Sequence, residues 1–143
     1  MSNQPIIVER LLNAPASKVW KALTDKNEMK IWYFDLAEFK AEVGFTFQFM
    51  GGEEGGVRYL HLCEVTEVVP ERKLTYSWRY DGYPGISQVS FELFEQGDQT
   101  LLTLTHTGLE TFPQDKPDFA AKNFGAGWNH LIHTALKDYL EKA

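Results

Sequence analysis

The chain has 143 residues, about the length of one average domain, and we find no repeat, low-complexity run or linker that would divide it. Its formal charge of −6 argues against nucleic acids and membranes as partners, since nucleic acids and anionic membrane surfaces bind basic patches and no apolar run reaches the roughly 18 residues of a membrane span. The single cysteine, Cys63, excludes a disulfide framework, and without a secretory leader we expect one cytoplasmic domain over residues 1–143.

The first third of the chain predicts one strand followed by two short helices. "PIIVERLLNA" is rich in β-branched and aliphatic residues and predicts a strand. Pro15 suits the first turn of a helix, and the apolar residues after it recur at helical spacing to about Thr24. "NEMKIWYFD" predicts a second short helix that runs into a loop and leaves Trp32 and Phe34 facing an apolar space.

From residue 37 the apolar residues recur with a period of two, which predicts five further strands. "EFKAEVGFTFQFM" places Phe39, Phe47 and Phe49 on one face, and the acidic "GGEEGG" after it predicts a flexible hairpin loop. The remaining strands are expected in "VRYLHLCEVTEVVP", "RKLTYSWRY", "SQVSFELFE" and "TLLTLTHTG", with the third and fourth of the five exposing one face to water.

Residues 125–142, "GAGWNHLIHTALKDYLEK", predict a long amphipathic helix after a loop over 108–123. Its apolar arc consists of Trp128, Leu131, Ile132, Ala135, Leu136 and Tyr139. His130 and His133 are expected outside this arc as solvated side chains, since no third metal ligand is near in sequence. The glycines of "GAG" are expected where the loop enters the helix, either as a mobile cavity mouth or as a poor helix start.

One amphipathic helix and one antiparallel sheet with an aromatic face must pack on each other, since neither has another partner of sufficient size. We therefore expect an α+β fold in which a bent six-stranded antiparallel sheet wraps around the C-terminal helix. This order of elements resembles the helix-grip fold of the START and birch-allergen-like superfamily, also called SRPBCC.

Four motifs narrow the resemblance further. They are "NAPASKVWKALTD" with "IWYF", "EVTEVVPERKLTYSW", "QVSFELFEQGDQTLLTLTHTGL" and "GWNHLIHTALKDYLE". In this order they are similar to the activator-of-heat-shock-protein-90 ATPase homologue family, over about Ile6 to Leu140. The resemblance implies a hydrophobic cavity between sheet and helix, which relatives use for lipids, hormones and polyketides. The eukaryotic cochaperone that names the family has a separate N-terminal domain with a principal chaperone contact, and nothing in this sequence corresponds to that domain.

Inward-facing aromatic and polar residues are the candidate ligand-binding set. Buried Tyr and Trp carry polar atoms that need a partner or water, so several on one face indicate a space that side chains do not wholly fill, with a filled core as the alternative. The set consists of Trp32, Phe34, Phe47, His61, Cys63, Tyr76, Trp78, Phe91, His106, Phe124, Trp128 and Ile132.

Three members of this set have a chemical alternative. His61 and His106 share a phase with apolar residues, so each is either a core histidine hydrogen-bonded to backbone or a group that orients a ligand or acts as a base. Cys63 is expected to pack as a small hydrophobe rather than as a reactive thiol, for which His61 would be the cationic neighbour.

We predict non-catalytic binding of a small hydrophobic or amphipathic molecule, with no cofactor and no metal. The alternatives are a cochaperone-like module that stimulates a heat-shock chaperone ATPase, and a cavity enzyme of hydrolase or cyclase type that uses His61 or His106. Paired carboxylates and a nucleophile with its base do not stand out, and "GGEEGG" is acidic where a phosphate loop needs Lys and Ser or Thr.

Overall fold

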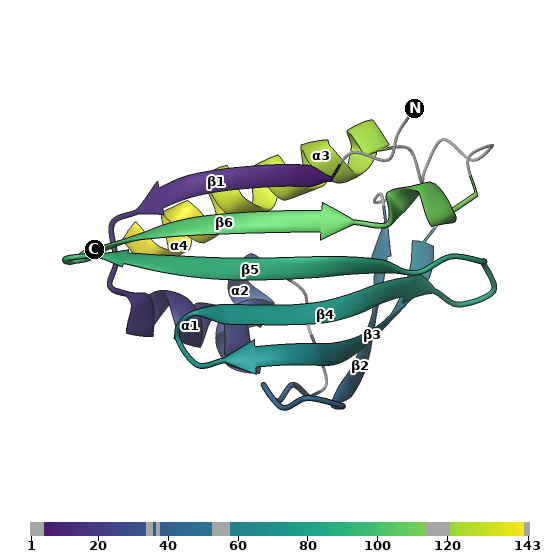
Figure 1. Cartoon of the computed structure of the whole chain (residues 1–143), viewed down its shortest axis with the longest axis horizontal. Helices are drawn as coiled ribbons and strands as arrows, with labels where there is room; N and C mark the ends of the chain where they lie inside the picture. The colour runs from purple at the N-terminus through teal and green to yellow at the C-terminus, as the bar shows by residue number, and fades with distance from the viewer. Residues whose placement is uncertain (1–4, 34–35, 37, 53–57, 114–120, 142–143) are drawn as a thin grey trace.

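The computed structural model describes residues 5–33, 36, 38–52, 58–113 and 121–141. A curved six-stranded antiparallel sheet, in the order β1-β6-β5-β4-β3-β2, packs against the C-terminal helix (Figure 1), which confirms the predicted fold class. The elements are β1 (Ile6–Leu12), α1 (Ala16–Thr24), α2 (Lys26–Trp32), β2 (Thr46–Gly52), β3 (Arg58–Val69), β4 (Lys73–Tyr80), β5 (Ser87–Gln96), β6 (Gln99–Thr107), the short 3-10 helix η1 (Leu109–Thr111), α3 (Ala121–His130), the π-helix η3 (Leu131–Leu136) and α4 (Lys137–Glu141).

The inner face of the sheet is set by the alternation of each strand. β1 pairs with β6, so the first and last strands lie side by side, with Val8 opposite Leu104. Along β3, the residues His61, Cys63 and Val65 are buried, so this face of the strand points toward the helices. Because alternate residues point to opposite faces, the buried residues of all six strands form one continuous wall against the helices.

The outer face of β4 is drier than the sequence predicted. Thr75 and Ser77, expected to face water, are only 8% and 7% exposed. The Thr75 and Ser90 hydroxyls lie 3.0 Å apart, and Ser77 Oγ accepts a hydrogen bond of 3.2 Å from the Glu64 amide. Side chains of the neighbouring strands cover these hydroxyls, and hydrogen bonds compensate their burial.

The predicted start of β2 was wrong. The strand begins at Thr46, because a turn ends the extended run before it: the Phe45 amide donates to the Glu42 carbonyl and Gly44 adopts a left-handed φ of +94°. Val43, which the alternation in "EFKAEVGFTFQFM" would place on the same face as Phe39 and Phe47, is 68% exposed. Phe39 still packs on the ring of Phe45, so the aromatic side chains reach the core from a loop.

The C-terminal helix also starts earlier than predicted. α3 begins at Ala121 and contains Gly125 and Gly127, so these glycines lie inside the helix and not at a loop entry. Packing of the apolar face outweighs the low helix propensity of glycine. The next six residues form the π-helix η3, whose wider turn brings Ile132, Leu136 and then Leu140 to the core.

The two helical histidines differ in environment. His130 is exposed, as expected. His133 is half-buried, and its Nδ1 atom is buried with no hydrogen-bond partner among the described residues. The prediction of a solvated pair therefore fails for His133, because it lies in η3, where the wider turn departs from the regular α-helical projection.

Two long-range hydrogen bonds hold the end of this helix to α1 and to the segment between β1 and α1, and a third holds that segment to β6. Lys18 Nζ donates to the Leu140 carbonyl at 2.9 Å, and the Asn13 amide donates to Glu141 Oε2 at 3.1 Å. Thr100 Oγ1 donates to the Ala14 carbonyl at 2.8 Å. The lysine satisfies a carbonyl that the helix end leaves without an intrahelical partner.

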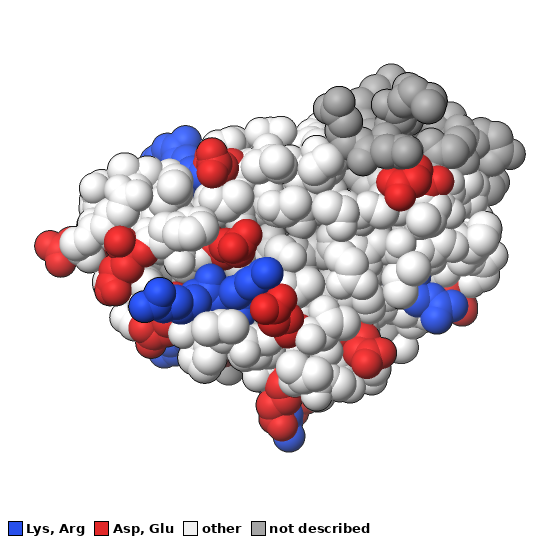
Figure 2. Space-filling view, in the orientation of Figure 1, with Lys and Arg blue, Asp and Glu red and all other residues white. Residues whose placement is uncertain are grey.

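Charged side chains of both signs are interspersed over the face of the sheet drawn in Figure 2, and much of that face is uncharged. None of the helices in the described part of the chain is long and apolar enough to cross a membrane.

Candidate functional site

Aromatic rings from the sheet, α2 and α3 meet between the sheet and the C-terminal helix. The ring centroid of Trp128 lies 5.6 Å from that of Trp78 and 6.0 Å from that of Phe91. Tyr33, just after α2, stacks with Trp32 and with Trp128, at centroid distances of 4.9 Å and 6.1 Å. Tyr33 therefore links α2 to the C-terminal helix through two ring contacts.

The network continues across the strands from Trp128 toward β2. Phe91 lies 5.9 Å from Tyr76, and Tyr76 lies 5.0 Å from Phe47. Ile132 is fully buried one turn after Trp128. The structure thus brings these members of the predicted set into one cluster.

A chain of hydrogen bonds fixes the protonation of His106. Trp128 Nε1 donates to His106 Nδ1 at 2.9 Å, and an indole nitrogen is a donor only, so Nδ1 carries no hydrogen. The neutral ring then carries its hydrogen on Nε2 and donates it to Ser87 Oγ at 2.7 Å, while Ser87 donates to the Trp78 carbonyl at 3.2 Å. Burial lowers the pKa of His106 to about 3. His106 is thus a donor to Ser87 and not a base that would activate it.

His61 is also held as a neutral ring. Its Nδ1 lies 2.9 Å from the Tyr59 carbonyl, which only accepts, so Nδ1 donates there. The ring stacks on Phe49 with centroids 4.5 Å apart. Burial lowers the pKa of His61 to about 4, although hydrogen bonds to the Tyr59 and Phe49 backbone act in the opposite direction.

Buried tyrosine hydroxyls pair within the same interior. The Tyr33 and Tyr76 hydroxyls lie 2.6 Å apart, and Trp78 Nε1 donates to the Tyr80 hydroxyl at 2.9 Å. Burial raises the pKa of all three tyrosines above the ordinary value. Tyr33 and Tyr80 were missed as site candidates, although Tyr80 shares the strand phase of Trp78 and Tyr33 lies inside "IWYF".

A family model matches most of the chain. The family model described as "Activator of Hsp90 ATPase homolog 1-like protein" matches residues 13–141. The chain belongs to this family. The resemblance seen in the sequence motifs is therefore confirmed, over nearly the whole chain.

Solved structures with the same fold extend the comparison. The chain is similar to BH1534 from Bacillus halodurans, at 27% identity and a TM-score of 0.74, covering 96% of this chain and 97% of the other. It is similar to DynU16, a protein in the dynemicin biosynthetic locus, at 25% identity and a TM-score of 0.76, covering 96% of this chain but only 47% of DynU16. The Aha1 dimer from Colwellia psychrerythraea has 23% identity and a TM-score of 0.68, covering 97% of each chain, and shows a shared fold. A comparison with curated proteins found no match.

The other residues of the predicted ligand-binding set lie at the edge of the aromatic cluster or outside it. Trp32 Nε1 donates to the Ala22 carbonyl at 2.8 Å, so this ring also fastens α2 to α1. Phe124 is half-buried and lies 5.4 Å from the ring of His106 and 5.9 Å from Phe112. Cys63 is buried, which raises the pKa of its thiol and leaves it a packing residue. Phe34 lies outside the described residues.

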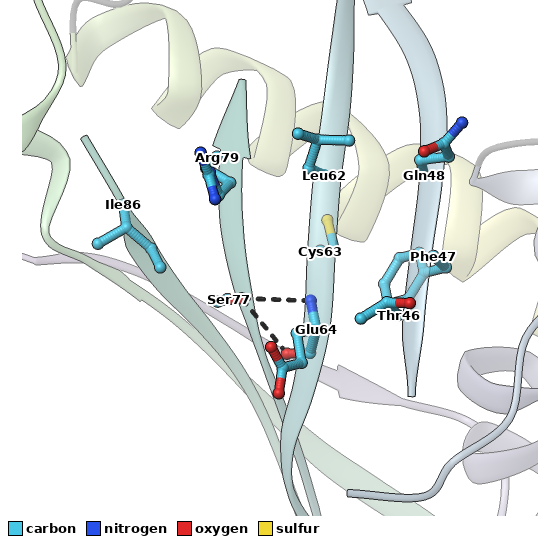
Figure 3. Close-up of a pocket in the computed structure, with 9 residues that line it drawn as sticks. All are labelled: Thr46, Phe47, Gln48, Leu62, Cys63, Glu64, Ser77, Arg79 and Ile86. Carbon is cyan, nitrogen blue, oxygen red and sulfur yellow. Dashed lines mark hydrogen bonds between the residues drawn. The ribbon is translucent and has the colours of Figure 1, made fainter. Parts of the chain in front are cut away.

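A separate groove of about 480 Å³ lies on the opposite face of the sheet (Figure 3), away from the C-terminal helix. It is lined by Thr46, Phe47, Gln48, Leu62, Cys63, Glu64, Ser77, Arg79 and Ile86. The side chains of Phe47 and Cys63 belong to the buried inner face, so the strands themselves form the floor. This groove could not be predicted from the sequence, because the residues that line it come together only through strand register.

The described residues contain no metal-binding cluster. Groups of three or more His, Cys, Asp or Glu side chains placed to hold an ion are absent there. The interior thus offers aromatic surface and neutral hydrogen-bonding groups.

Proposed function

We propose that this protein binds a small hydrophobic or amphipathic molecule between the sheet and the C-terminal helix, without catalysing a reaction on it. The stack of Trp32, Tyr33 and Trp128 carries the proposal, since Tyr33 is half-buried and marks where the aromatic interior approaches the surface. The similarity to a protein of a biosynthetic locus supports a small molecule as the partner.

Aromatic walls would supply most of the affinity. Burial of apolar ligand surface contributes about 25 cal/mol per Å², and the rings of Trp78, Phe91 and Trp128 are the walls on the sheet and the helix. The Tyr76 hydroxyl, in the middle of the cluster, is the polar group proposed to orient the ligand. Entry is proposed beside the half-buried rings of Tyr33 and Phe124.

The neutral histidines favour binding over catalysis. A general base must have a free lone pair near the reacting proton. The Nδ1 lone pair of His106 is occupied by Trp128, and a pKa of about 4, lowered by burial, makes His61 a weak base. The hydrolase or cyclase alternative would be revived only if exchange of either histidine for Gln abolished turnover of a substrate.

A thermal-shift screen of lipids, flavonoids and polyketide-like compounds tests the proposal. Compounds that raise the melting temperature should also quench tryptophan fluorescence, because Trp78 and Trp128 line the proposed site. Trp128→Phe and Tyr33→Phe should weaken binding, whereas Trp20→Phe, which changes a half-buried tryptophan of α1, should not. An equal response of Trp20→Phe and Trp128→Phe, both folded, would contradict binding in the interior.

A second candidate is a cochaperone-like protein contact, favoured by the family to which the chain belongs. In that case a partner protein would contact the outer surface, and the aromatic rings of the interior would serve only as packed core. Stimulation of a heat-shock chaperone ATPase that survives Trp128→Phe would favour this candidate over ligand binding.

A further inference from the structure

The groove on the outer face of β2, β3 and β4 is separated from the proposed interior site by the sheet itself. In Figure 3 the C-terminal helix lies behind the strands that carry the groove. Gln48, Leu62 and Arg79 alternate with Phe47, Cys63 and Trp78, which are buried on the inner face. Of the aromatic cluster, only Phe47 also lines the groove, and the rings of Trp78, Phe91 and Trp128 do not.

Two opposite charges are placed diagonally in this groove. Leu62 of β3 is in register with Arg79 of β4, and the next outward pair is Glu64 with Ser77. Arg79 and Glu64 are thus diagonal neighbours, with Cα atoms about 7–8 Å apart. Both are exposed.

Neither charge is neutralised by an ion pair in the described part of the chain. The ion pairs found there are Lys21–Glu28, Lys26–Glu38, Lys73–Glu67 and Lys137–Glu141. Figure 3 shows the Arg79 and Glu64 side chains apart along the groove. The groove thus presents a guanidinium and a carboxylate that are both open to a ligand.

The surroundings of these charges are held by hydrogen bonds. Ser77 Oγ accepts from the Glu64 amide at 3.2 Å and lies 3.5 Å from its carbonyl, which ties β3 to β4 beneath the carboxylate. Thr111 Oγ1 accepts from the Ile86 amide at 2.9 Å and donates to its carbonyl at 3.0 Å. Ile86, which is 50% exposed, and the half-buried Leu62 add apolar surface beside Arg79.

We propose that this groove binds a small zwitterion with an apolar substituent, the chemistry of a free amino acid with an aliphatic side chain. Its carboxylate pairs with Arg79, its ammonium with Glu64, and its aliphatic group covers Leu62 and Ile86. A simple anion would meet the Glu64 carboxylate, and a simple cation would meet Arg79, so a dipolar ligand fits the two charges best. The volume of about 480 Å³ lies within the range of small-molecule sites.

The affinity is expected to be modest, roughly in the millimolar range, because exposed ion pairs are weak. This site is independent of the proposed interior ligand, so either can fail without the other.

A titration of the ¹⁵N-labelled protein with L-leucine, followed by NMR, tests the proposal. Amide shifts are expected on β2, β3 and β4 around Gln48, Leu62 and Arg79. 4-Methylpentanoate, which lacks the ammonium group, and 3-methylbutylamine, which lacks the carboxylate, should each bind about fivefold more weakly or worse. Absence of shifts in the groove, or equal binding of either singly charged analogue, would overturn the proposal.

Charge variants test the two proposed ion pairs, Arg79 with the carboxylate and Glu64 with the ammonium group, one at a time. Arg79→Gln and Glu64→Gln should each weaken leucine binding, whereas Lys73→Gln, which removes a cation of β4 outside the groove lining, should leave it unchanged. A double variant, Arg79→Glu with Glu64→Arg, keeps both charges and should bind the zwitterion in the reverse orientation. Loss of binding in this folded double variant, or an equal loss in Lys73→Gln, would contradict the assignment.

Discussion

At the scale of single residues, the hydrogen-bond chain from Trp128 through His106 and Ser87 to the Trp78 carbonyl joins the C-terminal helix to β6, β5 and β4. Each member has one role because the indole nitrogen only donates and the carbonyl only accepts. Residue types in the sequence suggested an inward histidine. They did not identify Ser87 or the direction of the hydrogen bonds, since those depend on the register Trp78 opposite Ser87 and Val89 opposite His106.

Ser87→Ala should lower the free energy of unfolding by about 1–3 kcal/mol, because it leaves the buried His106 Nε2 hydrogen without an acceptor. Urea denaturation measures the change. Ser90→Ala is the matched control, since Ser90 is half-buried on the outer face and water can replace its contact with Thr75. A Ser87→Ala cost no larger than that of Ser90→Ala would contradict the directional chain.

The free energy of unfolding should decrease as the pH is lowered below about 6.5, the ordinary pKa of histidine. His61 and His106 remain neutral in the folded protein down to pKa values of about 4 and about 3, whereas the unfolded chain takes up their protons near pH 6.5. The unfolded state therefore binds more protons between these limits, and unfolding becomes easier as pH falls, by up to about 1.4 kcal/mol per pH unit for each histidine. Above pH 6.5 these two residues add no pH dependence.

Urea denaturation at pH 7.0 and pH 5.5 measures this slope. In His106→Gln, whose amide can accept from Trp128 and donate to Ser87, the slope should drop by the share of one histidine. An unchanged slope in this variant would show that other groups cause the pH dependence.

At the scale of elements, periodicity predicted which segments form strands and helices, but not where β2 and α3 begin. The alternation of phenylalanines continues through Phe45, so only the turn at Glu42–Phe45, with Gly44 at positive φ, reveals the strand start. In the same way, the two glycines before Trp128 weaken the local helix signal, although tertiary packing keeps α3 helical there.

Gly125→Ala and Gly127→Ala should each stabilise the protein by about 0.5–1 kcal/mol, because alanine has the higher helix propensity and an added Cβ meets nothing within 4 Å at either position. Thermal unfolding by circular dichroism measures the effect. Destabilisation by either substitution would indicate that these residues form a non-helical entry loop.

Gly85→Ala should be the most damaging of the turn substitutions. Gly85 has φ of +106°, and an added Cβ would lie 2.5 Å from the Thr111 carbonyl oxygen, so strain and a backbone clash combine. Gly82→Ala at φ +83° meets nothing within 4 Å and should cost only the roughly 1–2 kcal/mol of left-handed backbone. Equal costs in urea denaturation would contradict the close packing of η1 on the β4–β5 connection.

At the scale of the whole molecule, the wrapped sheet follows from an aromatic sheet face and one amphipathic helix that each lack another partner. The sequence therefore predicted the architecture and most of the aromatic cluster. The pairing of tyrosine and tryptophan polar atoms with one another depends on side chains from distant segments, such as Tyr33 with Tyr76. The outer groove likewise exists only through the register of β2, β3 and β4.

The proposal that this aromatic interior holds a small hydrophobic molecule is tested most directly by native mass spectrometry. The protein should be purified without denaturation and measured before and after incubation with a library of lipids, flavonoids and polyketide-like compounds. We expect a bound mass of one small molecule per chain, released by solvent extraction and diminished in Trp128→Phe but not in Trp20→Phe. A chain that carries no bound mass in either sample, or one whose bound mass is the same in all three proteins, would contradict ligand binding between the sheet and the C-terminal helix.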